Sequence, residues 1–174
     1  MIIKFLTSSP FNVVVNNLFW AGCVIGRYDF LWLVLPAILC YVALLVFRKA
    51  VLPNQLLVVI CIGVIIDSVF TVSGIFQFEQ NNLFLPLWMG ALWIAFATTL
   101  PMSLKLLGRN AYVAAATGAI GFPFSYFAGE KLGAVSFSLP PSVTLLLVAC
   151  TWAIALPLMY HLINRPRVIA NEAF

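Results

Sequence analysis

The stretch QLLVVICIGVIIDSVFTVSGIFQ, residues 55–77, is an almost unbroken run of aliphatic and aromatic side chains with one ionisable residue, Asp67, near its centre. A helix needs about 20 consecutive apolar residues to cross a hydrocarbon core of about 30 Å. Hydrophobic residues make up 64% of the chain and charged residues only 8%, and a soluble domain needs far more charge at its surface. The stretch therefore predicts a membrane-spanning helix in an integral membrane protein.

Five further apolar runs of similar length lie on either side of this stretch, separated by short segments. The six expected spans are residues 10–26, 30–47, 55–77, 84–104, 111–128 and 142–163. Because the segments between them are short, we expect residues 1–174 to form a single all-α transmembrane helical bundle without a soluble domain.

Two segments of the chain resemble each other and suggest an internal repeat. GVIIDSVFTVSG at 63–74 and GAIGFPFSYFAG at 118–129 share the positions of a glycine, an isoleucine and a second glycine, and a helix with Trp and Pro follows each of them. Such a repeat predicts that the six spans form three tandem helical hairpins. The alternative is that apolar segments resemble each other by composition alone.

The distribution of basic residues predicts the orientation of the chain. If the N-terminus is cytoplasmic, the outer segments contain Arg27 and Lys131. The cytoplasmic segments then contain all the others, which are Lys4, Arg48, Lys49, Lys105, Arg109, Arg165 and Arg167. This asymmetry follows the positive-inside rule and predicts that both termini are cytoplasmic. Because the basic residues are scattered over short loops, we expect them to contact lipid headgroups and not nucleic acid.

Small and polar residues recur at helical spacing on the third, fourth and fifth expected spans. They are Gly63, Asp67, Thr71 and Gly74 on the third, Ala91, Ala95, Thr98 and Thr99 on the fourth, and Gly118, Gly121, Ser125 and Gly129 on the fifth. Helices in lipid associate through close packing of small residues and through hydrogen bonds between helices. We therefore expect these three spans to pack most closely with one another.

Asp67 lies about 18 Å from the cytoplasmic end of its span, close to the middle of the bilayer, at about 1.5 Å per residue. Polar residues on other spans reach a similar depth, and we expect them to form one intramembrane polar site with Asp67. They are Asn16, Asn17, Thr98, Thr99, Ser125 and Tyr126. Two interpretations stay open. The acid is either a proton or cation site, or a protonated side chain that locks helices together by hydrogen bonds.

The remaining polar and sulfur-containing residues do not suggest a catalytic or metal site. Glu130 and Lys131, at the outer end of the fifth span, are candidates for a periplasmic mouth or form a solvated pair at a helix end. His161 is the one histidine and is expected at the cytoplasmic interface. The four cysteines are far apart and lie in apolar runs, so we expect no metal, no cofactor and no catalytic residue.

Several stretches carry a resemblance to a known family. They are GVIIDSVFTVSGIFQF (63–78), PLWMGALWIAFATTLPMSLKLL (86–107), GAIGFPFSYFAGEKLGAV (118–135) and WAIALPLM (152–159). Together they resemble a family of small six-span bacterial inner-membrane proteins catalogued as a domain of unknown function. The resemblance covers the chain from about residue 10 onward. It implies a link to membrane-lipid modification or stress response, and it fixes no site residue.

Two classes of function follow from these observations. A small transporter or channel would use Asp67 as its coupling or gating acid, at a site built from helices that proline interrupts. An accessory or lipid-interacting subunit would hold a lipid or a membrane partner protein, and Asp67 would be structural. In either class the chain contacts the lipid bilayer and could form a homo-oligomer. An intramembrane enzyme is the least supported class.

Overall fold

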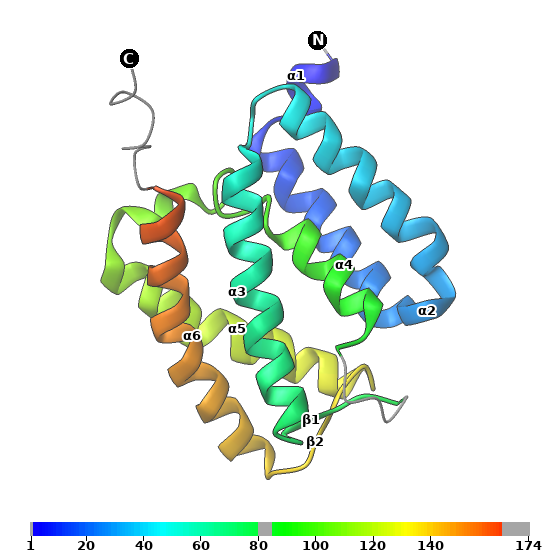
Figure 1. Cartoon of the computed structure of the whole chain (residues 1–174), viewed down its shortest axis with the longest axis vertical. Helices are drawn as coiled ribbons and strands as arrows, with labels where there is room; N and C mark the ends of the chain where they lie inside the picture. The colour runs from blue at the N-terminus through cyan, green and yellow to red at the C-terminus, as the bar shows by residue number, and fades with distance from the viewer. Residues whose placement is uncertain (1, 80–84, 165–174) are drawn as a thin grey trace, which may run out of the picture.

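The computed structural model describes residues 2–79 and 85–164, which are mostly helical (Figure 1). The elements in chain order are α1 (Ile2–Leu6), α2 (Ser9–Phe47), α3 (Pro53–Val72), β1 (Phe76–Gln77), α4 (Leu87–Phe96), the 3-10 helix η1 (Lys105–Arg109), α5 (Ala111–Lys131), β2 (Ser136–Phe137) and α6 (Pro141–Ile163). Three of these helices, α2, α3 and α6, are long and apolar enough to cross a membrane, and α4 is a shorter apolar helix.

A sharp reversal at Arg27 divides α2 into two arms that run side by side (Figure 1). Arg27 has φ 44° and ψ −121°, a backbone conformation that residues other than glycine rarely adopt. Its guanidinium holds this position through an ion pair of 2.5 Å with Glu79 and a 3.2 Å hydrogen bond to the carbonyl oxygen of Leu132. The first two expected spans, 10–26 and 30–47, therefore follow each other with no intervening loop.

Two glycines end helices in the same way. At the end of α3, Gly74 has φ 72°, and the amide of Ile75 donates to the carbonyl oxygen of Phe70. At the end of α5, Gly133 has φ 71°, and the amide of Ala134 donates to the carbonyl oxygen of Gly129. This is the Schellman arrangement, which satisfies carbonyl groups of the last helical turn.

Two helices, α3 and α4, are shorter than the sequence predicted. The third expected span reaches residue 77, but α3 ends at Val72, and β1 pairs with β2 in an antiparallel two-stranded sheet. The fourth expected span covers 84–104, but α4 ends at Phe96. The Thr98 and Thr99 hydroxyls then donate to carbonyl oxygens three residues back, and turns continue through Pro101, which has no amide hydrogen for a helix.

Four of the helices form two pairs, and a fifth helix joins the pairs. α2 packs on α4, α5 packs on α6, and α3 lies between the pairs and contacts both α4 and α6 (Figure 1). Gly118 allows the closest approach within the second pair, because a Cβ at this position would lie 2.1 Å from the carbonyl oxygen of Trp152. Gly63 similarly accommodates the Trp93 ring between α3 and α4.

The expectation that the third, fourth and fifth spans pack most closely is wrong. α5 makes its main contacts with α6, and α4 packs more extensively on α2 than on α3. The second expected hairpin also differs from the third. In the third, α5 packs mainly on its hairpin partner α6, whereas in the second α4 packs less on its hairpin partner α3 than on α2. The reason lies on α5, where Gly118 faces α6 and the other small residues, Gly121, Ser125 and Gly129, line an open space.

Candidate functional site

Asp67 lies on α3 with no exposed surface. The indole Nε1 of Trp93, on α4, donates to its Oδ2 atom at 2.7 Å, and the hydroxyl of Tyr126, on α5, donates to its Oδ1 atom. Asp67, Trp93 and Tyr126 form what we call the acid cluster. Because each member comes from a different helix, the cluster connects both helix pairs through α3.

Aromatic rings surround the acid cluster. Trp152 of α6 stacks on Trp93 with ring centroids 5.3 Å apart and on Phe122 at 3.7 Å with an interplanar angle of 2°. Phe76 of β1 stacks on Tyr126 at 5.0 Å. These rings separate the carboxyl group from the surroundings of the protein, so its two oxygens are held by neighbouring side chains in an apolar environment.

A second buried polar cluster connects α2 to the segment that follows α4. Asn12 has no exposed surface, and its Nδ2 donates to Thr98 Oγ1 at 2.9 Å and to the Tyr41 hydroxyl at 3.3 Å. The Ser103 hydroxyl donates to Asn12 Oδ1 at 2.6 Å, and Asn16 Nδ2 donates to Thr98 Oγ1 at 3.1 Å. These five residues form what we call the amide cluster. Of these five residues, Asn16 and Thr98 were expected at a polar site from the sequence, and the other three were not.

The remaining residues expected near Asp67 lie elsewhere. Asn17 is exposed and donates to the carbonyl oxygen of Val13 in its own helix at 2.8 Å. Thr99 also bonds locally, to Phe96. Ser125 accepts a 3.1 Å hydrogen bond from Trp20 of α2. Of the expected set, the structure therefore brings only Tyr126 to Asp67, and the single polar site that we expected is divided among separate places.

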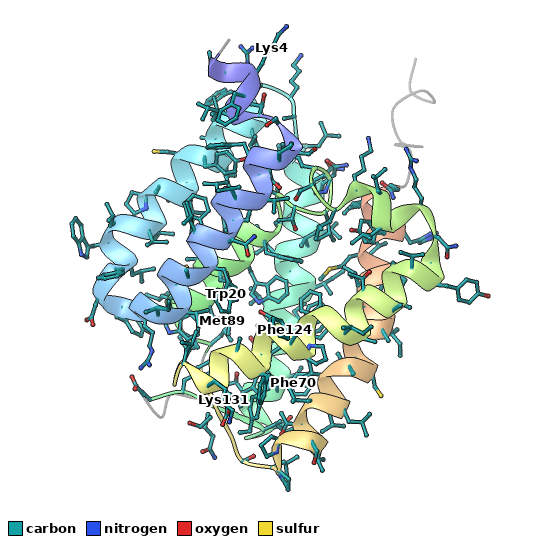
Figure 2. The ribbon with its side chains drawn as sticks, turned by 180° about the vertical axis from the view of Figure 1, so that it is seen from behind. Lys4, Trp20, Phe70, Met89, Phe124 and Lys131 are labelled. Atoms are coloured by element: carbon teal, nitrogen blue, oxygen red, sulfur yellow. The ribbon has the colours of Figure 1, made fainter. Side chains whose placement is uncertain are left out.

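A crevice of about 240 Å³ lies between α5 on one side and α2 and α4 on the other. Figure 2 shows Trp20 between α2 and α5, where its bond to Ser125 spans the two sides. Apolar and aromatic side chains make up most of the wall. The lining residues are Trp20, Val24, Trp88, Met89, Leu92, Trp93, Phe96, Leu104, Thr117, Gly121, Phe122, Ser125, Tyr126, Gly129, Ala134, Val135 and Leu156.

Asp67 is not part of the crevice wall, but both of its hydrogen-bond partners are. Trp93 and Tyr126 each line the crevice and each direct a polar atom away from it to the carboxyl group. The acid is thus one ring removed from the crevice. No charged side chain is among the lining residues, so the crevice is suited to an apolar molecule.

The candidate mouth residues Glu130 and Lys131 pair with each other at the end of α5. Lys131 Nζ lies 3.0 Å from Glu130 Oε2 and 5.1 Å from the centroid of the Phe127 ring. The structure therefore places this pair at one end of the molecule, next to Gly129 of the crevice wall. Figure 2 shows Lys131 and Lys4 at opposite ends.

His161 lines a second cavity, of about 400 Å³, where η1 and the start of α5 meet the end of α6. Tyr160 and Asn164 are its polar neighbours in the wall, and the Tyr160 hydroxyl donates to the carbonyl oxygen of Leu104 at 2.7 Å. Across residues 2–79 and 85–164, no three His, Cys, Asp or Glu side chains are grouped closely enough to hold a metal ion.

Comparison with known proteins gives a family and nothing more specific. A family model described as Protein of unknown function (DUF2878) matches residues 9–158, which include every lining residue of the crevice and both buried polar clusters. No curated protein and no solved structure matches the chain. The match agrees with the resemblance found in the sequence, and it leaves the role of the site to its geometry.

Proposed function

Because the chain belongs to the family described as Protein of unknown function (DUF2878), its role has to be argued from its own residues, and we propose that it is a lipid-interacting accessory protein of the bacterial inner membrane. In this proposal the chain crosses the membrane six times, has both termini in the cytoplasm and catalyses no reaction. The observation that carries the proposal is the apolar crevice between α5 and the pair formed by α2 and α4.

The arrangement of the helices supports six crossings. The reversal at Arg27 gives α2 two apolar arms. Helices α3, α5 and α6, and α4 together with the turns that follow it, supply four further apolar segments. α1 and the end of α6 lie at the same end of the molecule (Figure 1), as an even number of crossings requires. Lys4 lies at this end and Lys131 at the other (Figure 2), which agrees with their place in segments on opposite sides of a six-span chain.

The hydrogen bonding of Asp67 supports an accessory role over transport. A transport acid has to exchange its proton or bind a cation, and it therefore needs a route to water. Asp67 has no exposed surface, and donors from Trp93 and Tyr126 already occupy both of its oxygens. The acid thus serves as an acceptor that holds α3, α4 and α5 together.

One observation favours transport as a second candidate. Tyr126 forms part of the crevice wall and also donates to Asp67, so rotation of this one side chain would bring the carboxyl group into contact with the crevice. In this candidate Asp67 is the coupling acid, as the sequence analysis suggested. The two candidates differ in whether the ionisable group at position 67 is required.

The substitution Asp67→Asn separates the two candidates. The accessory role predicts that proton and monovalent-cation flux is the same in liposomes containing the purified wild-type protein and in liposomes containing Asp67→Asn. It also predicts that the two proteins retain the same amount of phospholipid during purification. A pH-sensitive dye inside the liposomes measures proton flux, and a sodium- or potassium-sensitive dye measures cation flux. Wild-type flux that is lost in a folded, equally abundant Asp67→Asn protein would establish transport instead.

A further inference from the structure

The walls of the crevice offer few polar groups to a ligand. The indoles of Trp20 and Trp93 donate to Ser125 and Asp67, and the Tyr126 hydroxyl also donates to Asp67. These aromatic side chains therefore present mainly ring surfaces to the open space. A ligand rich in hydroxyl, amine or phosphate groups would lose its hydrogen bonds to water there without replacement, which disfavours sugars, nucleotides and ions.

The crevice is also long for its volume. It extends along α5 from Thr117 to Gly129, a distance of about 18 Å at about 1.5 Å per helical residue. Its volume of about 240 Å³ lies below the range of about 300 to 1,000 Å³ that is usual for pockets enclosing a whole drug-sized ligand. A long, narrow space of this size holds one flexible chain, while the rest of the molecule stays outside.

The surroundings of the crevice determine which chains reach it. Gly121 lines the crevice and is itself exposed, so the space is open at this point of α5. Its neighbours Ile120 and Phe124 are 72% and 74% exposed, and Leu18 on α2 is 66% exposed. Apolar side chains exposed on membrane-spanning helices contact acyl chains, so the medium at the mouth of the crevice is hydrocarbon.

We propose that the crevice binds one acyl chain of a bilayer phospholipid, which enters sideways between α2 and α5, while the headgroup stays at the membrane surface. The inference rests on the proposed function, because the lipid contact is assigned only if these helices span the membrane. It deepens that function by naming the ligand and the place where it binds. Trp20 and Ser125, whose bond spans the crevice, hold its two sides at a fixed separation.

Tryptophan fluorescence tests the inference directly, because bromine atoms on an acyl chain quench an indole that they touch. Trp32 is 74% exposed and would contact bulk lipid in any case, so the test uses a Trp32→Phe background. Of the other indoles, Trp20, Trp88 and Trp93 line the crevice, and Trp88 and Trp93 are only 2% and 4% exposed. Quenching of these two buried indoles by brominated phosphatidylcholine therefore reports a chain inside the crevice.

Two glycines provide a matched pair of variants. A Cβ added at Gly121 or at Gly90 meets no atom within 4 Å, so neither backbone position is closed to a side chain at its first atom. Gly121 lines the crevice, whereas Gly90 of α4 is not among its lining residues. We expect Gly121→Phe to reduce quenching at least two-fold and Gly90→Phe to leave it unchanged. Thr117→Phe, toward the other end of the crevice, is a second filling variant if Gly121→Phe does not fold.

Phospholipid retention, measured by native mass spectrometry, distinguishes the failure of this inference from the failure of the proposed function. Equal quenching in both glycine variants, with phospholipid still bound to each, would overturn the acyl-chain site and leave a lipid-interacting protein. A wild-type protein that retains no phospholipid would overturn both. Loss of one bound phospholipid and of quenching in Gly121→Phe alone would support both.

Discussion

The acid cluster and the amide cluster are both buried in an apolar molecule, but they are built from different chemistry. Asp67 is an acceptor held by two aromatic donors, one on α4 and one on α5. Asn12 is both donor and acceptor, and its partners are hydroxyl groups, which rotate to suit their surroundings. The expected depth of a residue along its helix therefore does not decide which polar residues meet, because each donor needs an acceptor within reach.

The largest loss of stability is expected in the acid cluster, where the two donors have no other acceptor among the hydrogen bonds of the described residues. Asp67→Leu removes the acceptor for both the Trp93 N–H and the Tyr126 O–H, and a buried donor left without a partner costs about 1 to 3 kcal/mol. We expect the variant to lose about 2 to 4 kcal/mol of stability. Thermal unfolding in detergent, followed by circular dichroism, measures the loss.

A substitution at an exposed position of the same helix is the control for this loss. Ile65 is 61% exposed, so Ile65→Leu should unfold at the wild-type temperature. If Asp67→Leu also unfolds at the wild-type temperature, the acid cluster does not hold the helices together, and the comparison between the two clusters loses its basis.

A smaller loss is expected from Asn12→Leu, which empties the centre of the amide cluster. The Thr98 hydroxyl keeps its 2.9 Å bond to the carbonyl oxygen of Ala95, so Ser103 is the partner that loses its acceptor. We expect a loss of about 1 to 2 kcal/mol, measured by the same unfolding experiment. A loss larger than that of Asp67→Leu would reverse the ranking of the clusters.

Asp67→Asn should cost less than Asp67→Leu. An asparagine offers an oxygen to the Trp93 N–H and an amide group that donates to the Tyr126 hydroxyl, so only the Tyr126 O–H loses its acceptor. We expect the variant to lose about 1 kcal/mol of stability, measured by the same unfolding experiment. A loss as large as that of Asp67→Leu would mean that the carboxyl group, and not hydrogen bonding alone, stabilises the cluster.

The smallest effect is expected at Asn17, which belongs to neither cluster. It is exposed and bonds only within its own helix in the part of the chain that the structure describes. Asn17→Leu should change stability by less than about 0.5 kcal/mol, the usual range for surface positions. A marked destabilisation in the same unfolding assay would show that Asn17 has a partner outside this chain, such as a second copy.

Much of the helical content follows from the sequence, because long apolar runs have one stable form in lipid. The reversal at Arg27 does not, since its positive φ depends on contacts with Glu79 and Leu132 from distant segments. The end of α4 before residue 104 could have been predicted from the sequence, because Thr98, Thr99 and Pro101 are all residues that interrupt a helix.

The candidate site was harder to predict from the sequence. Trp93 is absent from the expected site because a tryptophan in an apolar run predicts packing and not a hydrogen bond, although its indole N–H is a donor. Asn12 had a usable signal, since it lies four residues before Asn16 and therefore on the same helix face. No signal in the sequence predicts the crevice, because the crevice forms only when α5 packs on α6 and no other helix covers Gly121.

The most direct test of the account is an experimental density map of the protein in lipid nanodiscs, at a resolution that separates acyl chains from water. We expect one elongated density in the crevice beside Gly121, and no water between the crevice and Asp67. A file of water molecules reaching Asp67 through the crevice would contradict the account and establish the acid as part of a transport route.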